Sequence, residues 1–330
     1  MKDIFDKKDI KPMLLTERNE SFNSPDYLYE LKLDGIRTII YVDKGNVEIR
    51  NKRNMRLNQT YPELADICGQ IKQKCILDGE IIAVKDGKPD FYAIQKRSMM
   101  TNKTKIEFAS KMYPVSFSAF DILYIGSEQI TGKPLVERKQ ILSENIVENE
   151  KIIVSRYIFE KGIELYNAAA SQDLEGIVAK KKDSKYYFGK RSKDWIKIKN
   201  LKDDDYVICG YVVKPGNKVS LILGAYNEGT LVRQGHVTMG VTREDFNKVL
   251  SVNRLNKPLF DDPSGNEATW IEPVLVCTVQ YMMKSEHGQM RQSVFKGIRN
   301  DKDPEQCVVK ETEYIGLLLQ ILKLNQNPGG

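Results

Sequence analysis

Glu30-Leu31-Lys32-Leu33-Asp34 alternates charged and apolar side chains and is closed by Gly35-Ile36-Arg37. Because side chains alternate faces along a strand, this pattern predicts an extended segment that buries both leucines and presents Lys32 between two carboxylates. A lysine amine is nucleophilic only when neutral, and its ordinary pKa is about 10.4, so a reactive lysine needs burial or neighbouring cations. An amphipathic strand with a salt-bridged face is the plainer interpretation. The string Lys-x-Asp-Gly-x-Arg favours the reactive one, since it occurs by chance on the order of once in several hundred chains of this length.

Composition describes an ordinary folded chain of 330 residues, with 41% hydrophobic and 29% charged residues. That length allows two domains with substantial cores. No apolar run approaches the roughly 18 residues of a spanning helix, so we expect no membrane segment. Residues 1–6 lack the apolar core of an export signal, and five scattered cysteines suit reduced cytoplasmic thiols. With only two histidines and no CxxC pair, a zinc site or a histidine-based triad is disfavoured.

Positive charge is concentrated in residues 180–199, which hold nine Lys or Arg against two acids, while the whole chain carries a net charge of +6. Such a run is usually a solvated face. Here it is interleaved with the aromatic residues Tyr186, Tyr187, Phe188 and Trp195. That mixture is typical of contact with nucleic acid or phosphate.

Hydrophobic patterning predicts a mixed first domain and a β-rich second one. In the first we expect strands at Tyr27–Val42, Val47–Arg50, Ile76–Val84, Val115–Tyr124, Gly176–Ala179 and Trp195–Ile198, and helices at Pro62–Ile67, Leu135–Asn149 and Gly162–Gln172. After the acidic stretch Lys202–Asp205, strands at Tyr206–Val213, Val219–Ala225, Leu231–Val237 and Pro273–Tyr281 predict a small antiparallel barrel. The expected domains are 1–201 and 202–310, followed by a tail over 311–330, and apolar spacing predicts an amphipathic helix from Pro304 to Leu324.

Two acids, Glu80 and Glu175, stand beside apolar strands. Each alone is most simply a surface acid. Together with a reactive lysine and a basic strand, they suit magnesium-dependent nucleotidyl or phosphoryl transfer. On the strand Trp195–Lys199, Lys197 and Lys199 share one face and repel each other unless an anion lies between them. They could lower the pKa of a nearby lysine, or simply protect a sheet edge.

These strings resemble, in the same order, the motifs of the covalent nucleotidyltransferases and specifically of the ATP-dependent DNA ligases. The matching strings are Lys32–Arg37, Lys52–Asn54, Asp78–Glu80, Phe120–Leu123, Glu175–Lys180 and Trp195–Lys199. Val294–Glu305 is similar to the ending of the ligase module of bacterial DNA ligase D. One departure is Lys52, which stands where the family usually has serine before the Arg-Asn pair.

The resemblance implies an α+β fold: an adenylation (nucleotidyltransferase) domain with antiparallel sheets and flanking helices, followed by an OB-fold β-barrel. It implies that Lys32 attacks the α-phosphorus of ATP and carries AMP, which passes to the 5′-phosphate of a nick before the 3′-hydroxyl displaces it. By the same resemblance, the catalytic residues are Lys32, Asp34, Lys197, Lys199, Arg299 and Lys302. ATP contacts are expected from Glu30, Lys32, Arg37, Arg53, Glu80, Phe120, Val178, Lys180, Lys197 and Lys199, and Glu80 and Glu175 are the expected ligands of Mg²⁺, with Mn²⁺ as an alternative.

The implied substrate is nicked or broken duplex DNA, and the implied process is repair by non-homologous end joining. A Ku-like end-binding protein and a polymerase are the implied partners, and we expect a monomer in the bacterial cytosol or nucleoid. An RNA-capping guanylyltransferase or an RNA ligase remains an alternative because such enzymes share the lysine motif. A non-catalytic nucleic-acid-binding OB protein is another, although such a binder has no need of Lys32 and its acids.

Overall fold

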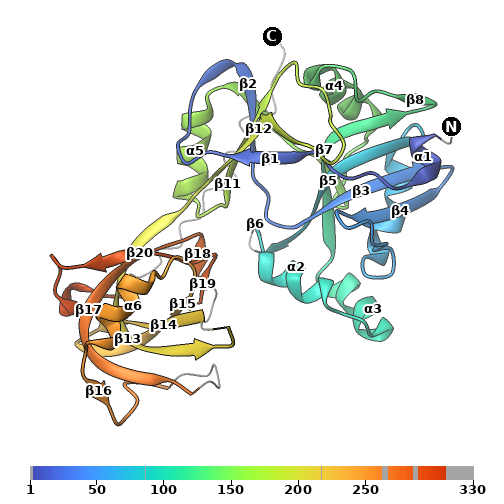
Figure 1. Cartoon of the computed structure of the whole chain (residues 1–330). Helices are drawn as coiled ribbons and strands as arrows, with labels where there is room; N and C mark the ends of the chain where they lie inside the picture. The colour runs from blue at the N-terminus through green and yellow to red at the C-terminus, as the bar shows by residue number, and fades with distance from the viewer. Residues whose placement is uncertain (1–2, 86, 217, 262–266, 285–288, 310–330) are drawn as a thin grey trace. The chain divides into compact units, whose positions relative to one another are not determined.

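The computed structural model describes residues 3–85, 87–216, 218–261, 267–284 and 289–309. The chain forms two compact units, the first ending at Asn200 and the second beginning at Leu201 (Figure 1). None of the helices in these described ranges is long and apolar enough to cross a membrane. Of the helix expected over 304–324, residues Pro304–Gln306 form the short 3-10 helix η2. The rest of that segment from residue 310, including the expected tail 311–330, lies outside the described residues.

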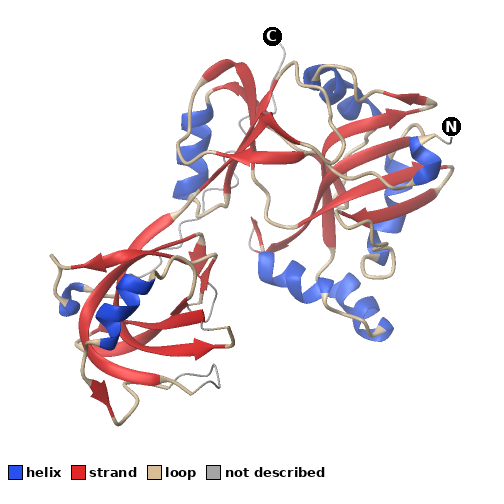
Figure 2. Ribbon diagram, in the orientation of Figure 1, coloured by secondary structure: helices blue, strands red, loops and turns tan. Residues whose placement is uncertain are grey.

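Two β-sheets packed on a shared core make up the first unit (Figure 2). One sheet has the strand order β1-β12-β11-β2-β10, with strands Leu14–Glu17, Arg191–Lys199, Gly176–Lys181, Ser24–Leu31 and Tyr157–Glu160. The other has the order β4-β3-β5-β7-β8, with strands Asn46–Asn51, Ile36–Asp43, Cys75–Lys85, Val115–Ile125 and Glu128–Gln129. Two short strands, β6 (Lys88–Pro89) and β9 (Ile152–Val154), pair with β5 and β7. All described pairs are antiparallel except β1 with β12 and β9 with β7.

Helices cover the outer faces of these sheets. Helix α4 (Leu135–Asn145) packs on β7, α5 (Gly162–Ser171) packs on β2 and β11, and the 3-10 helix η1 (Pro62–Gln70) completes the expected set. The short helix α1 (Ile4–Lys7), whose Phe5 packs in the core shared by the two sheets, was not expected. The pattern analysis missed α2 (Phe91–Ser98) and α3 (Lys103–Met112). Both are short and polar, yet both carry the N-cap side chains that begin helices, Asp90 on the Ala93 N–H and Asn102 on the Lys105 N–H.

The expected single strand Tyr27–Val42 is wrong, because the chain leaves one sheet after Leu31 and enters the other at Ile36. Lys32 and Asp34 therefore lie on the crossing between the sheets, and the prediction that they share a strand face with Glu30 fails with it. Gly35 permits this crossing: a Cβ at that position would lie 2.1 Å from the Ile81 carbonyl oxygen. The crossing is thus pressed against β5 at the point where Glu80 lies.

The second unit is a curled antiparallel sheet with an OB-like half-barrel form, which confirms the expected fold class. Its sheet order is β15-β14-β13-β17-β16, with β20 also paired to β17. These strands span Thr230–Val237, Lys218–Asn227, Lys202–Lys214, Thr269–Tyr281, Arg254–Leu255 and Val294–Arg299, and a two-stranded ribbon joins β18 (Met283–Lys284) to β19 (Met290–Arg291). Helix α6 (Arg243–Leu250), which the pattern analysis missed, is capped by Thr242 on the Asp245 N–H.

Candidate active site

Lys32 is held at the end of β2 by bonds at both ends of the residue. Its backbone N–H donates to the carbonyl oxygen of Gly176 at 2.9 Å, and its Nζ lies 2.8 Å from Oε1 of Glu175. Gly176 has φ +130, and a Cβ there would lie 2.1 Å from the Ile198 carbonyl oxygen. Glycine at this position therefore lets β11 begin close to β12, with Glu175 directed at the amine. The Lys32 side chain remains 22% exposed, so the amine is accessible to a substrate.

Glu80 brings a second carboxylate to Lys32. It lies on β5, where it pairs in register with Arg37 of β3. Burial raises the pKa of Glu80 to about 8; Lys32 and Arg37 oppose that shift, and the carboxylates of Glu175 and Asp78 add to it. The charges of Lys32 and Glu175 are therefore close enough to Glu80 to change its pKa. A bound cation would favour its ionised form.

Lys197 and Lys199 contact an acid that the sequence did not reveal. Glu30 pairs with Val178, Val178 with Lys197, and Lys197 with Glu17, so these four residues form one row across four strands. Paired residues on neighbouring strands share a face. The Glu17 carboxylate lies 2.9 Å from Nζ of Lys197 and 3.1 Å from Nζ of Lys199. The anion expected between these two lysines is therefore the carboxylate of Glu17, on β1.

A cavity opens between the two sheets beside Lys32. Seven of the expected site residues line it: Glu30, Lys32, Arg37, Glu80, Phe120, Val178 and Lys180. Five further lining residues were not anticipated: Leu15, Leu31, Leu33, Ser155 and Trp195. The cavity therefore combines apolar and aromatic walls with a small set of charged groups, which is typical of a site for a small organic ligand.

A buried charge cluster contributes Glu30, Ser155 and Lys180 to the lining of this cavity. Glu30, which is 3% exposed, forms ion pairs with Lys139 and, at 2.9 Å, with Lys180, and it accepts a 3.2 Å hydrogen bond from Ser155. The Lys180 Nζ also lies 4.3 Å from the ring centroid of Phe120. Burial lowers the pKa of Lys180 to about 8, opposed by Glu30 and reinforced by Lys139. Lys139 belongs to α4, more than 100 residues from Glu30 in sequence, and no motif indicated it.

Arg37 is engaged within the protein. Its Nε and one terminal nitrogen donate to the two oxygens of Asp78 at 3.1 and 2.7 Å, and the Tyr186 hydroxyl donates to Asp78 at 2.6 Å. The guanidinium lies 5.2 Å from the centroid of Phe120. A forked contact from Arg37 to a ligand therefore requires this pair to open, whereas one nitrogen can act with the pair intact.

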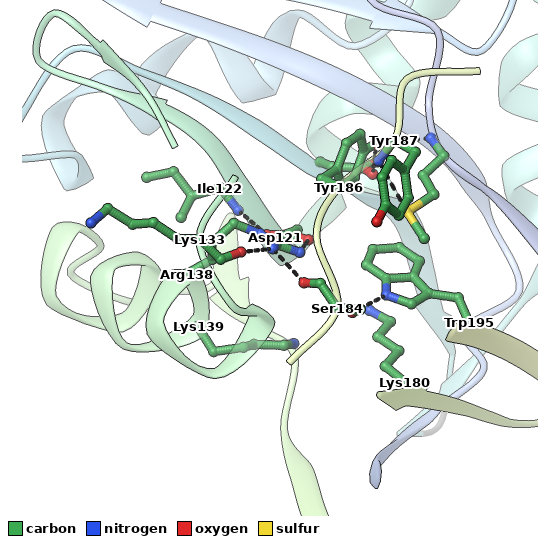
Figure 3. Close-up of polar contacts among 12 residues, drawn as sticks. Asp121, Ile122, Lys133, Arg138, Lys139, Lys180, Ser184, Tyr186, Tyr187 and Trp195 are labelled. Carbon is green, nitrogen blue, oxygen red and sulfur yellow. Dashed lines mark hydrogen bonds and ion pairs between the residues drawn. The ribbon is translucent and has the colours of Figure 1, made fainter. Parts of the chain in front are cut away.

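Figure 3 shows a second buried network, which ties α4 to the aromatic wall of the cavity. Arg138 donates to both oxygens of Asp121 at 2.8 Å, and its Nη1 donates to the carbonyl oxygens of Lys133 and Ser184 at 2.6 and 2.8 Å. The Ser184 hydroxyl accepts a 3.2 Å bond from the indole N–H of Trp195. The position of Trp195 is therefore coupled to a charge pair that is fully shielded from solvent.

The other expected site residues lie outside the cavity lining. Arg53 is exposed on the loop after β4. Asp34 lies on the crossing segment, partly buried. Arg299 and Lys302 belong to the second unit, where both contact Asp205. The sequence had marked Asp205 only as part of the acidic stretch that begins the second domain.

The donor set at Lys32 can be tested against a divalent cation. No group of three or more His, Cys, Asp or Glu residues that could hold a metal occurs in the part of the chain that the structure describes. Mg²⁺, however, is usually bound through one or two carboxylates together with substrate phosphates and water. Glu80 and Glu175, both beside Lys32, supply that partial set. They fit a cation that arrives with a polyphosphate and do not form a complete protein cage.

A lysine amine beside two acids, among the residues that line a cavity and next to a sheet that carries a lysine pair, is the arrangement of a covalent nucleotidyltransferase. Comparison with known proteins narrows this class. Residues 12–199 match the family model of the ATP dependent DNA ligase domain, and residues 215–302 match that of the ATP dependent DNA ligase C terminal region. The chain belongs to the ATP-dependent DNA ligase family.

Individual relatives agree with that assignment. The chain is 31% identical over 291 residues to the SPbeta prophage-derived DNA ligase-like protein LigB of Bacillus subtilis, over 88% of this chain and 99% of that protein. It is 30% identical over 318 residues to the multifunctional non-homologous end joining protein LigD of Mycolicibacterium smegmatis, over 91% of this chain but only 40% of that protein. The solved structure of mycobacterial DNA ligase D complexed with ATP and MES has a TM-score of 0.54 and 26% identity, covering 92% of this chain and 99% of that one.

Proposed function

We propose that this ATP-dependent DNA ligase seals 3′-hydroxyl/5′-phosphate breaks in duplex DNA through AMP carried on Lys32. The observation that carries the proposal is the position of the Lys32 amine, 2.8 Å from Glu175, on a residue that lines the cavity together with Glu30, Phe120 and Lys180. A nucleophile that lines the cavity is placed to attack a nucleotide whose base occupies it.

The base is assigned to the buried end of the cavity. An adenine ring presents an amino donor beside a ring-nitrogen acceptor, and the carboxylate of Glu30 and the ammonium of Lys180 offer the complementary acceptor and donor. Phe120 supplies a face for stacking, and Val178 is proposed to cover the opposite face of the base. Arg53 lies outside this lining, so we assign it to the ribose or to a phosphate reached as substrate binds.

The chemistry divides into three displacements at phosphorus. The neutral Nζ of Lys32 forms a bond to the α-phosphorus of ATP as the bond to pyrophosphate breaks, which leaves a phosphoramidate. An oxygen of the 5′-phosphate then takes AMP from Lys32, and the amine recovers a proton. Finally the 3′-hydroxyl attacks that phosphate and AMP leaves. Lys197 and Lys199 neutralise charge that develops on the α-phosphate, and Asp34 is assigned to orientation of Lys32.

Divalent cation chemistry is assigned to Glu80 and Glu175, which would hold Mg²⁺ or Mn²⁺ against the phosphates, where it neutralises their charge. Arg299 and Lys302 of the second unit are proposed to contact the β- and γ-phosphates and so assist departure of pyrophosphate. They would then matter for formation of lysyl-AMP and not for the two later steps.

We further propose a role in repair by non-homologous end joining within a bacterial cytosol or nucleoid. Support comes from the LigD relative, whose name places it in that process, although this chain spans less than half of its length. A Ku-like end-binding protein and a separate polymerase are the proposed partners, and the ligase is proposed to act as a monomer. Duplex contacts should fall mainly on phosphates, so sealing should weaken steeply with salt.

A nick-sealing assay tests this function. The full chain is incubated with Mg²⁺ and either ATP or GTP, and with singly nicked duplexes that carry DNA or RNA on each side of the nick. The proposal predicts ATP-dependent sealing of the all-DNA nick and its loss in Lys32→Ala, while Lys103→Ala, a change to a lysine on α3 whose side chain is 91% exposed, retains it. Sealing or labelling only with GTP would favour a guanylyltransferase, sealing only of RNA would favour an RNA ligase, and binding without nucleotide transfer would favour the OB-protein alternative.

A further inference from the structure

Asp205 lies at the centre of a charge cluster on the second unit. It is on β13, paired in register with Thr278 of β17, whose hydroxyl donates to its Oδ1 at 2.6 Å. Its Oδ2 accepts from Nζ of Lys302 at 2.9 Å and from Nη1 of Arg299 at 3.3 Å. The Asp205 side chain is only 15% exposed. One carboxylate, anchored by a neighbouring strand, thus holds both cations.

The remaining nitrogens of Arg299 are held from the other side. Its Nε and Nη2 donate to the two oxygens of Asp301 at 2.7 Å. Asp205 and Asp301 together therefore contact all three guanidinium nitrogens and set the plane of the group. Burial acts to raise the pKa of Asp205, but the bonds from Thr278 and Lys302 outweigh it and the pKa is lowered, so the carboxylate is ionised near neutral pH.

Three consecutive aspartates begin β13, and only one has this role. Asp203 is exposed, and Asp204 accepts a hydrogen bond from the hydroxyl of Tyr281. Only Asp205 has ion pairs to Arg299 and Lys302 among the contacts that the structure records for these three acids. The two neighbouring aspartates have the same side chain but lack these ion pairs. A substitution at one of them therefore serves as a control for the same substitution at Asp205.

We infer that Asp205 is the positioning residue for Arg299 and Lys302 in formation of lysyl-AMP. The inference rests on the proposed function, in which these two cations act on the departing pyrophosphate. Lysine and arginine have among the largest side-chain conformational entropies, so freely rotating cations would lose much of it on contact with phosphate. Because Asp205 restricts both side chains before ATP binds, they lose less conformational entropy when they contact the phosphates. Asp205 itself touches no reacting atom.

Single-turnover kinetics with the full chain separates this role from a general one. Formation of Lys32-AMP is timed with ATP and Mg²⁺, and sealing of a pre-adenylylated nick is timed separately. Asp205→Asn should slow the first reaction by about tenfold and the second by less than about twofold, since a displaced contact group affects only the step that uses it. Asp203→Asn, on the same strand and exposed, should leave both rates unchanged. Thr278→Val, which removes only the anchor of Asp205, should give a smaller loss confined to the first reaction.

A double variant tests whether Asp205 acts through Lys302. The Asp205→Asn change added to Lys302→Ala should cost less than about twofold beyond Lys302→Ala alone, because residues that act as one unit are non-additive. Three results would each overturn the inference while leaving the roles of Arg299 and Lys302 intact. These are rate losses that multiply in the double variant, equal slowing of both reactions in Asp205→Asn, and wild-type rates in Asp205→Asn. Wild-type Lys32-AMP formation in both Arg299→Ala and Lys302→Ala would instead remove the proposed function of that pair.

Discussion

Replacement of Arg138 by methionine should destabilise the first unit more than any change at its surface. Arg138 and Asp121 are both 0% exposed, and the arginine donates four hydrogen bonds: two to Asp121 and one each to the carbonyls of Lys133 and Ser184. In Arg138→Met, Asp121 keeps the 2.9 Å bond from the Ile122 N–H but loses its counter-ion. Removal of one partner of a buried ion pair costs about 3–5 kcal/mol.

The double variant Asp121→Leu/Arg138→Met isolates the origin of that cost. It removes both charges and leaves two carbonyl oxygens without the arginine, so we expect a loss of about 1–3 kcal/mol, smaller than in the single variant.

Urea unfolding followed by tryptophan fluorescence measures these differences. Arg156→Met is the matched control, because Arg156 is 61% exposed and pairs with Glu148 at 2.7 Å on the surface; it should lose less than about 1 kcal/mol. Because Ser184 links Arg138 to Trp195, Arg138→Met should also raise the ATP concentration needed for half-maximal adenylylation. Equal losses in Arg138→Met and Arg156→Met, or a double variant no more stable than the single one, would refute the reasoning.

Three further changes probe the site itself. Glu17→Gln should make pyrophosphate a better inhibitor of adenylylation by about fivefold, since a unit charge a few ångströms from an anion in water is worth about 1 kcal/mol; an unchanged inhibition constant would contradict this, and exposed Glu20→Gln is the control. Lys180 has a pKa of about 8 in the folded protein and about 10.4 in the unfolded chain, so between these pH values the unfolded state binds more protons. The free energy of unfolding of the wild type should therefore rise relative to that of Lys180→Met as the pH goes from about 8 to about 10. An equal pH dependence of unfolding in the two proteins would contradict this prediction. Glu80→Gln should raise the Mg²⁺ requirement of adenylylation at least roughly tenfold, measured by metal titration after EDTA treatment, and an unaltered titration would remove Glu80 as a ligand.

Local patterns were sufficient for much of the fold. Strand β7 was predicted from its alternation of residue types, and β14 from a short apolar run between turn segments that contain Gly216 and Gly229. The β3–β4 hairpin was predicted from Gly45-Asn46, and in the structure Lys44 and Gly45 of its turn both have positive φ. The break between β2 and β3 was missed, because the strand predicted over Tyr27–Val42 runs through Asp34-Gly35, a dipeptide that is typical of turns. What ends β2 is the approach of Gly35 to the Ile81 carbonyl, a contact between segments far apart in sequence.

The site residues also fall into those that short sequence motifs identify and those whose role depends on contacts between distant segments. Lys32, Glu80, Glu175 and the lysine pair stand in short strings that can be recognised one at a time. Glu17 and Lys139 cannot, since each acquires its role from pairing at long range: β1 beside β12 across about 180 residues, and α4 against Glu30. Arg37 shows what residue type alone leaves out: it suggested a forked ligand contact, and the fold directs two of the guanidinium nitrogens to Asp78 while Arg37 still lines the cavity.

Peptide mapping by mass spectrometry after incubation with ATP and Mg²⁺ tests the central claim most directly. Transfer of AMP to a lysine amine adds about 329 Da, and the increment should lie on the peptide that contains Lys32, disappear on addition of pyrophosphate, and be absent from Lys32→Ala. An adduct on another residue, an adduct that persists in Lys32→Ala, or no adduct at all would contradict it.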